Sequence, residues 1–282
     1  MKKRLLTALA GITVAVGWMC TVYTPLYSII LGIVSAIGVY ELLRVFGVKN
    51  KIFSALCLLL GCGLVVYADY RDKLSLPFFP CAAAVIILSL IIMLSDYKEL
   101  KFEQTVCCLF GAWAIPSALS SVIYFRDIYL TRSDLFTKSD GIFLILFAFF
   151  CAWITDGFAL FAGMAFGKHK LAPVISPKKT IEGAIGGVIG NTILCCLLWL
   201  IFHSKFGLAE IIKLPYVIIC ALVLSVFSIF GDLAASAIKR HQGIKDFGNI
   251  LPGHGGMMDR FDSALFVFPL LYLILLIAGK YI

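Results

Sequence analysis

The sequence predicts an all-α, polytopic integral membrane protein with about nine transmembrane helices, and two observations carry this prediction. The 282 residues are 61% hydrophobic and only 14% charged, with a mean hydropathy of +1.01, which is too apolar for a water-soluble chain. Apolar stretches of about 16 to 25 residues recur along the chain, each close to the length that crosses a hydrocarbon core. Such stretches must be helices, because lipid offers no partner to an unpaired backbone group.

The expected spans cover, in chain order, residues 5–20, 24–43, 52–68, 77–95, 104–125, 141–167, 183–203, 214–238 and 263–279. The first follows Met1-Lys2-Lys3-Arg4, a basic start that a cleavable signal peptide shares. A second span follows at once and no convincing cleavage site precedes a soluble domain, so we expect a retained span. Glycines spaced as GxxxG at 163/167, 183/187 and 186/190 predict close approach between helices.

The domain organisation is expected to be simple. Residues 1–140 form N-terminal transmembrane helices, and residues 141–282 form C-terminal helices that carry the functional site, as parts of one continuous membrane domain. All ten cysteines lie within or beside apolar spans and none forms a CxxC pair, so we expect packing residues rather than disulfides or a zinc site.

The distribution of positive charge predicts the orientation. Alternate connections, counted from the N-terminus, hold 16 Lys and Arg residues, against 8 in the remaining connections. Positive loops stay in the cytoplasm, so we expect a cytoplasmic N-terminus, with the polar connections 168–182 and 239–262 on the same face. The net charge of +8 is then explained by this asymmetry and by anionic lipid, without a nucleic-acid partner.

The segment 231–263 concentrates ionisable side chains at a membrane boundary, a density that packing does not explain. It holds four carboxylates, four cationic side chains and two histidines: Asp232, Asp246, Asp259 and Asp262; Lys239, Arg240, Lys245 and Arg260; His241 and His254. Of these, Asp232 follows an almost wholly apolar run, where an acid is costly unless it is paired or bound to a metal. We therefore expect a functional site in this segment.

Helical spacing groups several of these side chains. Asp232, Ser236 and Lys239 share one helix face, which could hold a cation and a phosphate together. Asp259 and Asp262 likewise share a face at the start of the last span and offer oxygen ligands that Mg²⁺ accepts. The Gly-rich turn 253–256 allows close backbone approach to a phosphate.

A second polar region lies upstream. Ser176-Pro177 has the pattern of a helix start, and Lys178 and Lys179 in the first turn would then form an anion site. Asp156 lies between apolar residues in the sixth span. An acid within a span indicates function by default, with a paired structural acid as the alternative.

The spacing from Ser236 to Asp262 resembles the signature of the phosphatidate cytidylyltransferase family. The pattern is Ser, two residues, Lys-Arg, four residues, Lys-Asp, then Pro-Gly-His-Gly-Gly, two residues, Asp-Arg, one residue, Asp. The motif 176–183 and Asp156 extend the resemblance, which covers about the last 130 residues. Family members often carry Tyr at the position of Leu160 and a basic residue at that of Met164, so we assign no ligand contact there.

The resemblance implies roles for individual residues. Asp232, Asp259, Lys239 and Arg240 are expected to be catalytic, and Asp232, Asp259 and Asp262 to bind metal. The expected substrate-binding residues are Asp156, Ser176, Lys178, Lys179, Glu182, Ser236, Lys245, Asp246, His254 and Arg260.

The resemblance also implies an activity: transfer of CMP from CTP to phosphatidic acid, giving CDP-diacylglycerol and pyrophosphate. Mg²⁺ is the expected cofactor, with a second cation such as K⁺ as an option. The expected setting is the plasma membrane, the inner membrane of a bacterium, with a cytoplasmic active site and a homodimer as a candidate assembly.

Two alternatives stay open at this point. One is a CTP-dependent enzyme acting on another lipid, such as a polyprenol kinase or an ether-lipid cytidylyltransferase. The other is a transporter or flippase, suggested by Asp156 and Asp232 within spans, although these acids cluster at one face and no repeated halves are evident.

Overall fold

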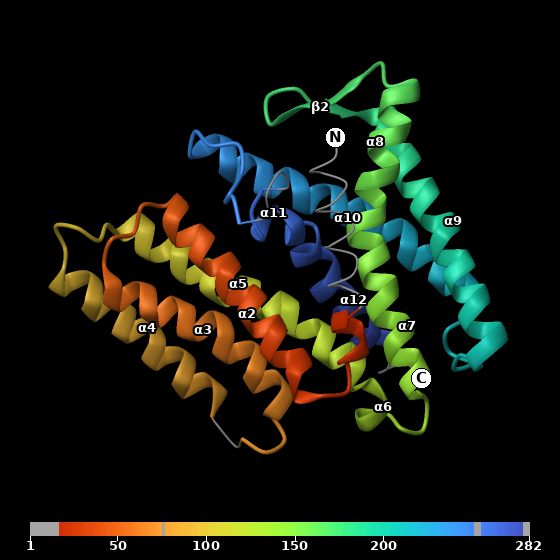
Figure 1. The fold of residues 1–282 in the computed structure, drawn as a ribbon, viewed down its shortest axis with the longest axis horizontal. Coiled ribbons are helices and arrows are strands. Elements are labelled where there is room, and N and C mark those ends of the chain that lie inside the picture. The colour runs from red at the N-terminus through yellow and green to blue at the C-terminus, as the bar shows by residue number, and fades with distance from the viewer. Residues whose placement is uncertain (1–16, 75–76, 251–254, 279–282) are drawn as a thin grey trace. The chain divides into compact units, whose positions relative to one another are not determined.

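The computed structural model describes residues 17–74, 77–250 and 255–278, and almost all its elements are helices (Figure 1). Within these described ranges, six helices are long and apolar enough to cross a membrane, by length and composition. The predicted all-α, multi-pass fold is therefore confirmed. The exact count of nine stays a prediction, because most of the expected span 5–20 lies outside the described residues and two apolar helices are shorter.

The described chain forms two compact units. The first combines residues up to Ser120 with 246–260, and the second combines 121–245 with the residues from Phe261 onward. The expected boundary near residue 140 stays a prediction.

The first unit contains α2 (Pro25–Val45), α3 (Lys51–Tyr70), α4 (Phe78–Ser95) and most of α5 (Phe102–Arg126). The turn after α2 uses Gly47 with a φ of 67°, a left-handed conformation that glycine adopts without strain. Asn50 then caps α3, because its side-chain oxygen accepts a hydrogen bond from the Phe53 N–H at 2.8 Å. The segment 246–260 adds most of the short helix α11 (Met258–Phe261).

The second unit contains α6 (Ile128–Thr131), α7 (Lys138–Phe149), the π-helical turn η1 (Phe150–Ile154) and α8 (Thr155–Phe166). The last three form one continuous apolar span. A hairpin of β1 (Lys170–Ala172) and β2 (Ser176–Thr180) follows, and then α9 (Ile181–Phe206), α10 (Leu214–His241) and α12 (Ala264–Ala278).

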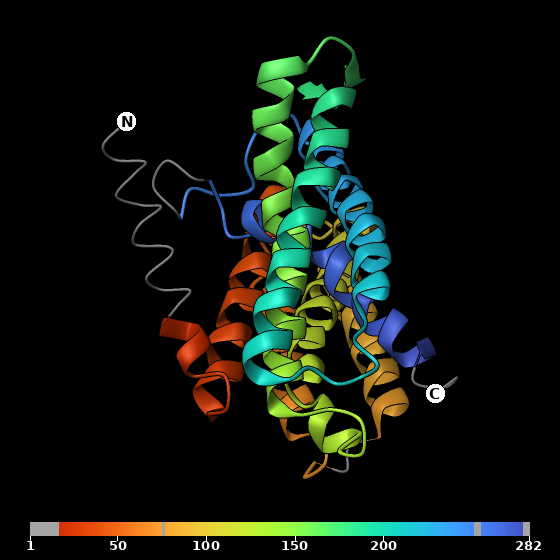
Figure 2. The same ribbon diagram turned by 90° about the vertical axis from the view of Figure 1, so that its right-hand side faces the viewer.

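Glycines bring α8 and α9 into close contact, and both ribbon views show the two helices side by side below the hairpin (Figures 1 and 2). A Cβ atom added at Gly187 would lie 2.7 Å from the Thr155 carbonyl oxygen, and one at Gly183 would lie 2.7 Å from that of Ala159. The close approach predicted from the GxxxG spacing is therefore confirmed.

Small polar contacts connect the helices of the second unit. Asn191 on α9 donates a hydrogen bond to Ser225 on α10 at 2.9 Å, and Ser228 donates to the Ala152 carbonyl in η1 at 3.1 Å. All three side chains that take part in these bonds are fully buried. All ten cysteines are free, and four of them, Cys57, Cys108, Cys151 and Cys195, are buried as packing residues.

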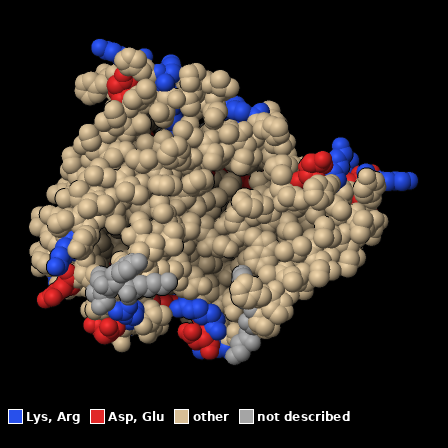
Figure 3. Space-filling view, turned by 180° about the vertical axis from the view of Figure 1, so that it is seen from behind, with Lys and Arg blue, Asp and Glu red and all other residues tan. Residues whose placement is uncertain are grey.

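The surface is that of a protein in lipid. In the face shown in Figure 3, charged side chains gather at the margins and a wide area carries no Lys, Arg, Asp or Glu. Many large apolar side chains are exposed on the described helices, among them Leu59 and Phe110. Apolar exposure of this extent suits helices that cross a hydrocarbon core.

One local prediction is wrong. Ser176-Pro177 does not start a helix, because residues 176–180 form β2, which pairs antiparallel with β1. The helix begins at Ile181 instead, where the Thr180 hydroxyl accepts a hydrogen bond from the Gly183 N–H at 3.1 Å. Lys178 and Lys179 therefore lie on a strand before α9 and not in its first turn.

Candidate active site

Three charged side chains from separate elements meet in the second unit. Lys179 on β2 forms an ion pair with Asp232 on α10, and its ammonium lies 3.7 Å from Oδ1 of Asp156 on α8. Asp156 lies two residues after the end of the π-helical turn, a feature that is often found at functional sites. Asp156 and Asp232 thus share the cation of Lys179. Such pairing is expected in a membrane-spanning chain, because an unpaired carboxylate within a span is costly.

The face of α10 that carries Asp232 is polar over two turns. The Ser236 hydroxyl donates a hydrogen bond to Asp232 Oδ1 at 3.4 Å, and Lys239 is only 7% exposed. The predicted alignment of Asp232, Ser236 and Lys239 on one helix face is in accord with this geometry.

The residues just before α12 add to this cluster. The Ser263 hydroxyl donates a hydrogen bond to Asp156 Oδ2 at 3.3 Å, and the Ser263 N–H donates to Asp262 Oδ1 at 2.7 Å. Close approach requires Gly231, since a Cβ atom there would lie 2.9 Å from the Asp262 carbonyl oxygen. Burial, and to a lesser degree the Asp232 carboxylate, raise the pKa of Asp262 to about 7.

Glu182 and Arg240 hold the hairpin in place. The Glu182 carboxylate accepts a hydrogen bond from the Lys168 N–H at 3.0 Å and lies 2.6 Å from Nδ1 of His169. The Arg240 side chain donates to the carbonyls of Ile175 and Ile244, at 3.3 and 3.0 Å. Their contacts are therefore with the protein, and their expected roles toward substrate stay predictions.

Asp259 belongs to the first unit, where it organises the Gly-rich segment. Its Oδ2 accepts hydrogen bonds from the N–H groups of Phe247 and Gly256, at 2.8 and 3.0 Å. The last span begins only at Ala264, so Asp259 and Asp262 both precede it, and Asp259 lies on the separate short helix α11.

The structure identifies a further acid that sequence reasoning missed. Glu41 on α2 is fully buried, and its two carboxylate oxygens accept hydrogen bonds from the N–H groups of Met257 and Met258, at 2.9 and 2.8 Å. A Cβ atom at Gly248 or Gly256 would strike this carboxylate. The signal was present, because Glu41 is an acid within an apolar span, which indicates function by default.

The remaining expected residues lie as follows. Ser176 pairs with Ala172 across the hairpin, and His254 lies outside the described residues. The side chains of Lys178, Lys245, Asp246 and Arg260 are exposed. Leu160 and Met164 on α8 are 61% and 67% exposed, so the positions at which the chain departs from the family pattern lie on an open helix face.

The acids of this cluster fit a magnesium ion whose remaining ligands would come from the substrate. Within the described ranges, no three His, Cys, Asp or Glu side chains converge as a metal-ligand set. Mg²⁺ is commonly held by one or two carboxylates together with substrate phosphates. Asp156 and Asp232 already place two carboxylates around one cationic group, which matches this donor set.

Comparisons with known proteins decide the family. A model of the cytidylyltransferase family matches residues 2–278. The chain belongs to this family. A phosphatidate cytidylyltransferase of Staphylococcus haemolyticus is 36% identical over 280 residues, which cover 98% of this chain and 99% of the relative. The enzymes so named from Staphylococcus saprophyticus and Staphylococcus aureus strain COL are 50% and 49% identical over 140 residues, covering about half of each chain.

The family resemblance expected from the last 130 or so residues is thus confirmed, and the match extends over the N-terminal helices as well. Glu41 therefore lies within the part of the chain that the family model matches. A full-length match to transferases also leaves the transporter alternative without support.

Proposed function

We propose that this protein transfers CMP from CTP to phosphatidate, giving CDP-diacylglycerol and pyrophosphate. The observation that carries the proposal is the match to a relative of that name over 98% of the chain. The cluster of Asp156, Lys179 and Asp232 supports it, because opposed charges at a membrane boundary suit a reaction between a lipid phosphate and a nucleotide.

The reaction needs no protein nucleophile. A phosphate oxygen of phosphatidate forms a bond to the α-phosphorus of CTP, and the bond from that phosphorus to the oxygen bridging to the β-phosphorus breaks. The electron pair leaves with pyrophosphate. Phosphatidate is already an anion, so the task of the protein is to position two anionic reactants and to offset their charge.

Cationic side chains on the hairpin and on α10 can position the two reactants and offset their charge. Lys179 would contact a phosphate once substrate competes with its two carboxylates, and Lys239 lies one turn beyond Ser236 on the same face. Asp156 and Asp232, with Asp262, would hold Mg²⁺, which supplies charge neutralisation on the triphosphate. The metal-binding role of Asp259 rests on the resemblance, as does a second cation such as K⁺.

The topology follows from the charge count. The twofold excess of Lys and Arg supports a cytoplasmic position for the hairpin and for residues 239–262, in a plasma or bacterial inner membrane. CTP would then arrive from the cytoplasm while phosphatidate arrives within the bilayer. A homodimer stays a prediction that crosslinking of the purified protein in nanodiscs can decide.

The test is a two-label assay with purified protein and Mg²⁺, in which phosphatidate, a polyprenol and an ether lipid are offered in parallel reactions. CTP labelled at the α-phosphate should transfer its label to lipid, whereas CTP labelled at the γ-phosphate should release it as pyrophosphate. Transfer of the γ-label to a polyprenol would instead indicate a kinase, and transfer of the α-label to an ether lipid but not to phosphatidate would indicate the other cytidylyltransferase. Either result overturns the proposal.

A further inference from the structure

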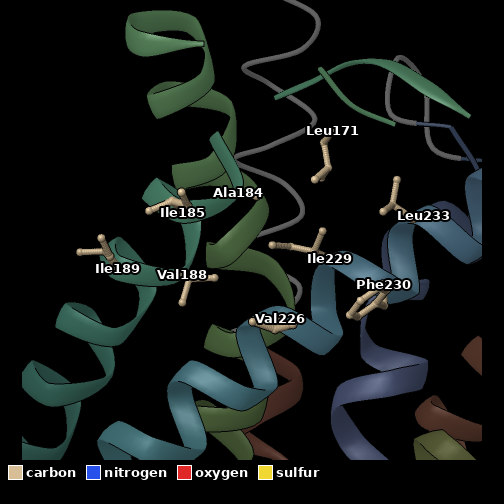
Figure 4. A pocket seen from close by; sticks show the side chains of 9 residues that line it. All are labelled: Leu171, Ala184, Ile185, Val188, Ile189, Val226, Ile229, Phe230 and Leu233. Atoms are coloured by element: carbon tan, nitrogen blue, oxygen red, sulfur yellow. The ribbon is translucent and has the colours of Figure 1, made fainter. Parts of the chain in front are cut away.

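An apolar groove lies between α9 and α10, in the half of each helix nearest the hairpin (Figure 4). Its volume is about 380 Å³. Val188 on α9 and Ile229 on α10 point into it, and no charged or polar side chain lines it. It belongs entirely to the second unit, as does the cluster around Asp232.

The two ends of the groove differ. Beyond the lining residues Ile189 and Val226, at the end away from the hairpin, Asn191 donates a hydrogen bond to Ser225, which joins the two helices. Its other end reaches Leu233, the residue that follows Asp232. Between Val226 and Leu233 the groove runs along α10 over roughly 10 Å, at a rise of about 1.5 Å per residue, and it ends one residue from Asp232.

The hairpin connects the groove with the cluster. Leu171 on β1 lies over the groove (Figure 4). Lys179 on β2, the other strand of the hairpin, forms the ion pair with Asp232. Leu171 lies where the register of the hairpin shifts, between Lys170 and Ala172. Such irregularities redirect a side chain, and they are common beside active sites.

We propose that this groove binds an acyl chain of the phosphatidate substrate and so sets the acyl-chain preference of the enzyme, an inference that rests on the proposed function. A lipid whose phosphate lies at Lys179 has its tail directed into the bilayer, which is the direction of the groove. The apolar lining suits a hydrocarbon chain, and the cation at its mouth suits the phosphomonoester. The groove is long enough for the part of the acyl chain nearest the glycerol, and the rest of the acyl chain would lie in the membrane.

Substitution of Val226, at the deep part of the groove, tests this assignment. Val226 is 41% exposed, so V226W fills the groove without disturbing a packed core. The matched control is V223W, one turn earlier in α10, since Val223 is 39% exposed and does not line the groove. CMP transfer is measured in mixed micelles with dihexanoyl and with dioleoyl phosphatidate.

We expect V226W to lower kcat/KM for dioleoyl phosphatidate about tenfold or more relative to dihexanoyl phosphatidate, because several methylenes lose their site. The KM for CTP should not change, and V223W should keep the wild-type ratio. An equal effect of V226W on both substrates, or no effect, would overturn the proposal.

A second measurement does not depend on activity. A phosphatidate with a photoreactive diazirine in one acyl chain should label peptides of residues 184–189 or 226–233, and excess unlabelled phosphatidate should suppress the labelling. If phosphatidylcholine suppresses the labelling equally, the labelled segments contact only the surrounding lipid. If other peptides are labelled, the acyl chain binds at another site. Either outcome contradicts the proposed binding of an acyl chain in the groove. Inactivity of the wild type toward every phosphatidate would instead contradict the proposed function.

Discussion

Asp232 is the residue on which the charged cluster depends most. It pairs with Lys179, accepts a hydrogen bond from Ser236 and lies on a membrane-spanning helix. An acid in this environment is stable because a cation is shared with it, and a second acid, Asp156, contacts the same ammonium. In the proposed function, these acids would hold a metal ion once substrate draws Lys179 away.

Replacement of Asp232 by Asn should lower kcat for CMP transfer by about a hundredfold or more, since one preorganised electrostatic group is removed from the reaction site. Asp259→Asn should also abolish transfer while leaving membrane insertion intact. The measurement is the labelled transfer assay with purified variants of matched thermal stability. Full activity in either variant would remove that residue from the metal-binding set.

We expect Glu41 to contribute to stability and to CTP binding, because its carboxylate accepts hydrogen bonds from the Gly-rich segment. Glu41→Ala leaves the N–H groups of Met257 and Met258 without acceptors, which costs about 1 to 3 kcal/mol for each buried group. We expect a lower unfolding temperature in detergent and a higher KM for CTP. Glu41→Gln keeps one acceptor oxygen and should give an intermediate result; wild-type stability in Glu41→Ala would contradict these hydrogen bonds.

At the scale of the elements, the hydrophobic pattern was sufficient to place the helices. Eight of the nine expected spans correspond to described helices, with ends that differ by a few residues, because length and apolar composition decide what crosses lipid. The hairpin was missed because Ser-Pro is also a helix-start pattern, and pairing between residues 170 and 180 is not visible in periodicity. The π-helical turn before Asp156 depends on packing that one sequence does not reveal.

The glycine interface between α8 and α9 predicts a strong local sensitivity. Gly187→Val should destabilise the protein by about 1 to 3 kcal/mol, because the added side chain has no room beside the Thr155 carbonyl. Thermal unfolding in detergent measures the change. Gly63→Val on α3 is the control, since no other group lies within 4 Å of a Cβ atom there. Equal stability of the two variants would contradict the close packing.

At the scale of the whole molecule, sequence reasoning found the family, the membrane-spanning fold and most of the charged cluster, since motif spacing and intramembrane acids are local signals. It could not find the pairing of Lys179 with Asp156 and Asp232, which joins three elements. It also missed the part played by the N-terminal half, because Glu41 acts on residues more than 200 positions later in the chain.

The predicted orientation can be tested across the membrane. Single cysteines at the exposed positions 178 and 245, in a variant without the ten native cysteines, should react with an impermeant thiol reagent only from the cytoplasmic side. The cysteines at positions 178 and 245 should react from the same side. A cysteine at Lys138, in a connection assigned to the other side, is the control, and reaction of all three from one side would contradict the topology.

The proposed role of the cluster of Asp156, Lys179 and Asp232 is to bind CTP together with Mg²⁺. The most direct test is calorimetric binding of a non-hydrolysable CTP analogue to purified wild-type protein and to Asp232→Asn, with and without Mg²⁺. Wild-type protein should bind the analogue far more tightly when Mg²⁺ is present, and Asp232→Asn should lose most of this difference. An undiminished Mg²⁺ dependence in Asp232→Asn would contradict the claim.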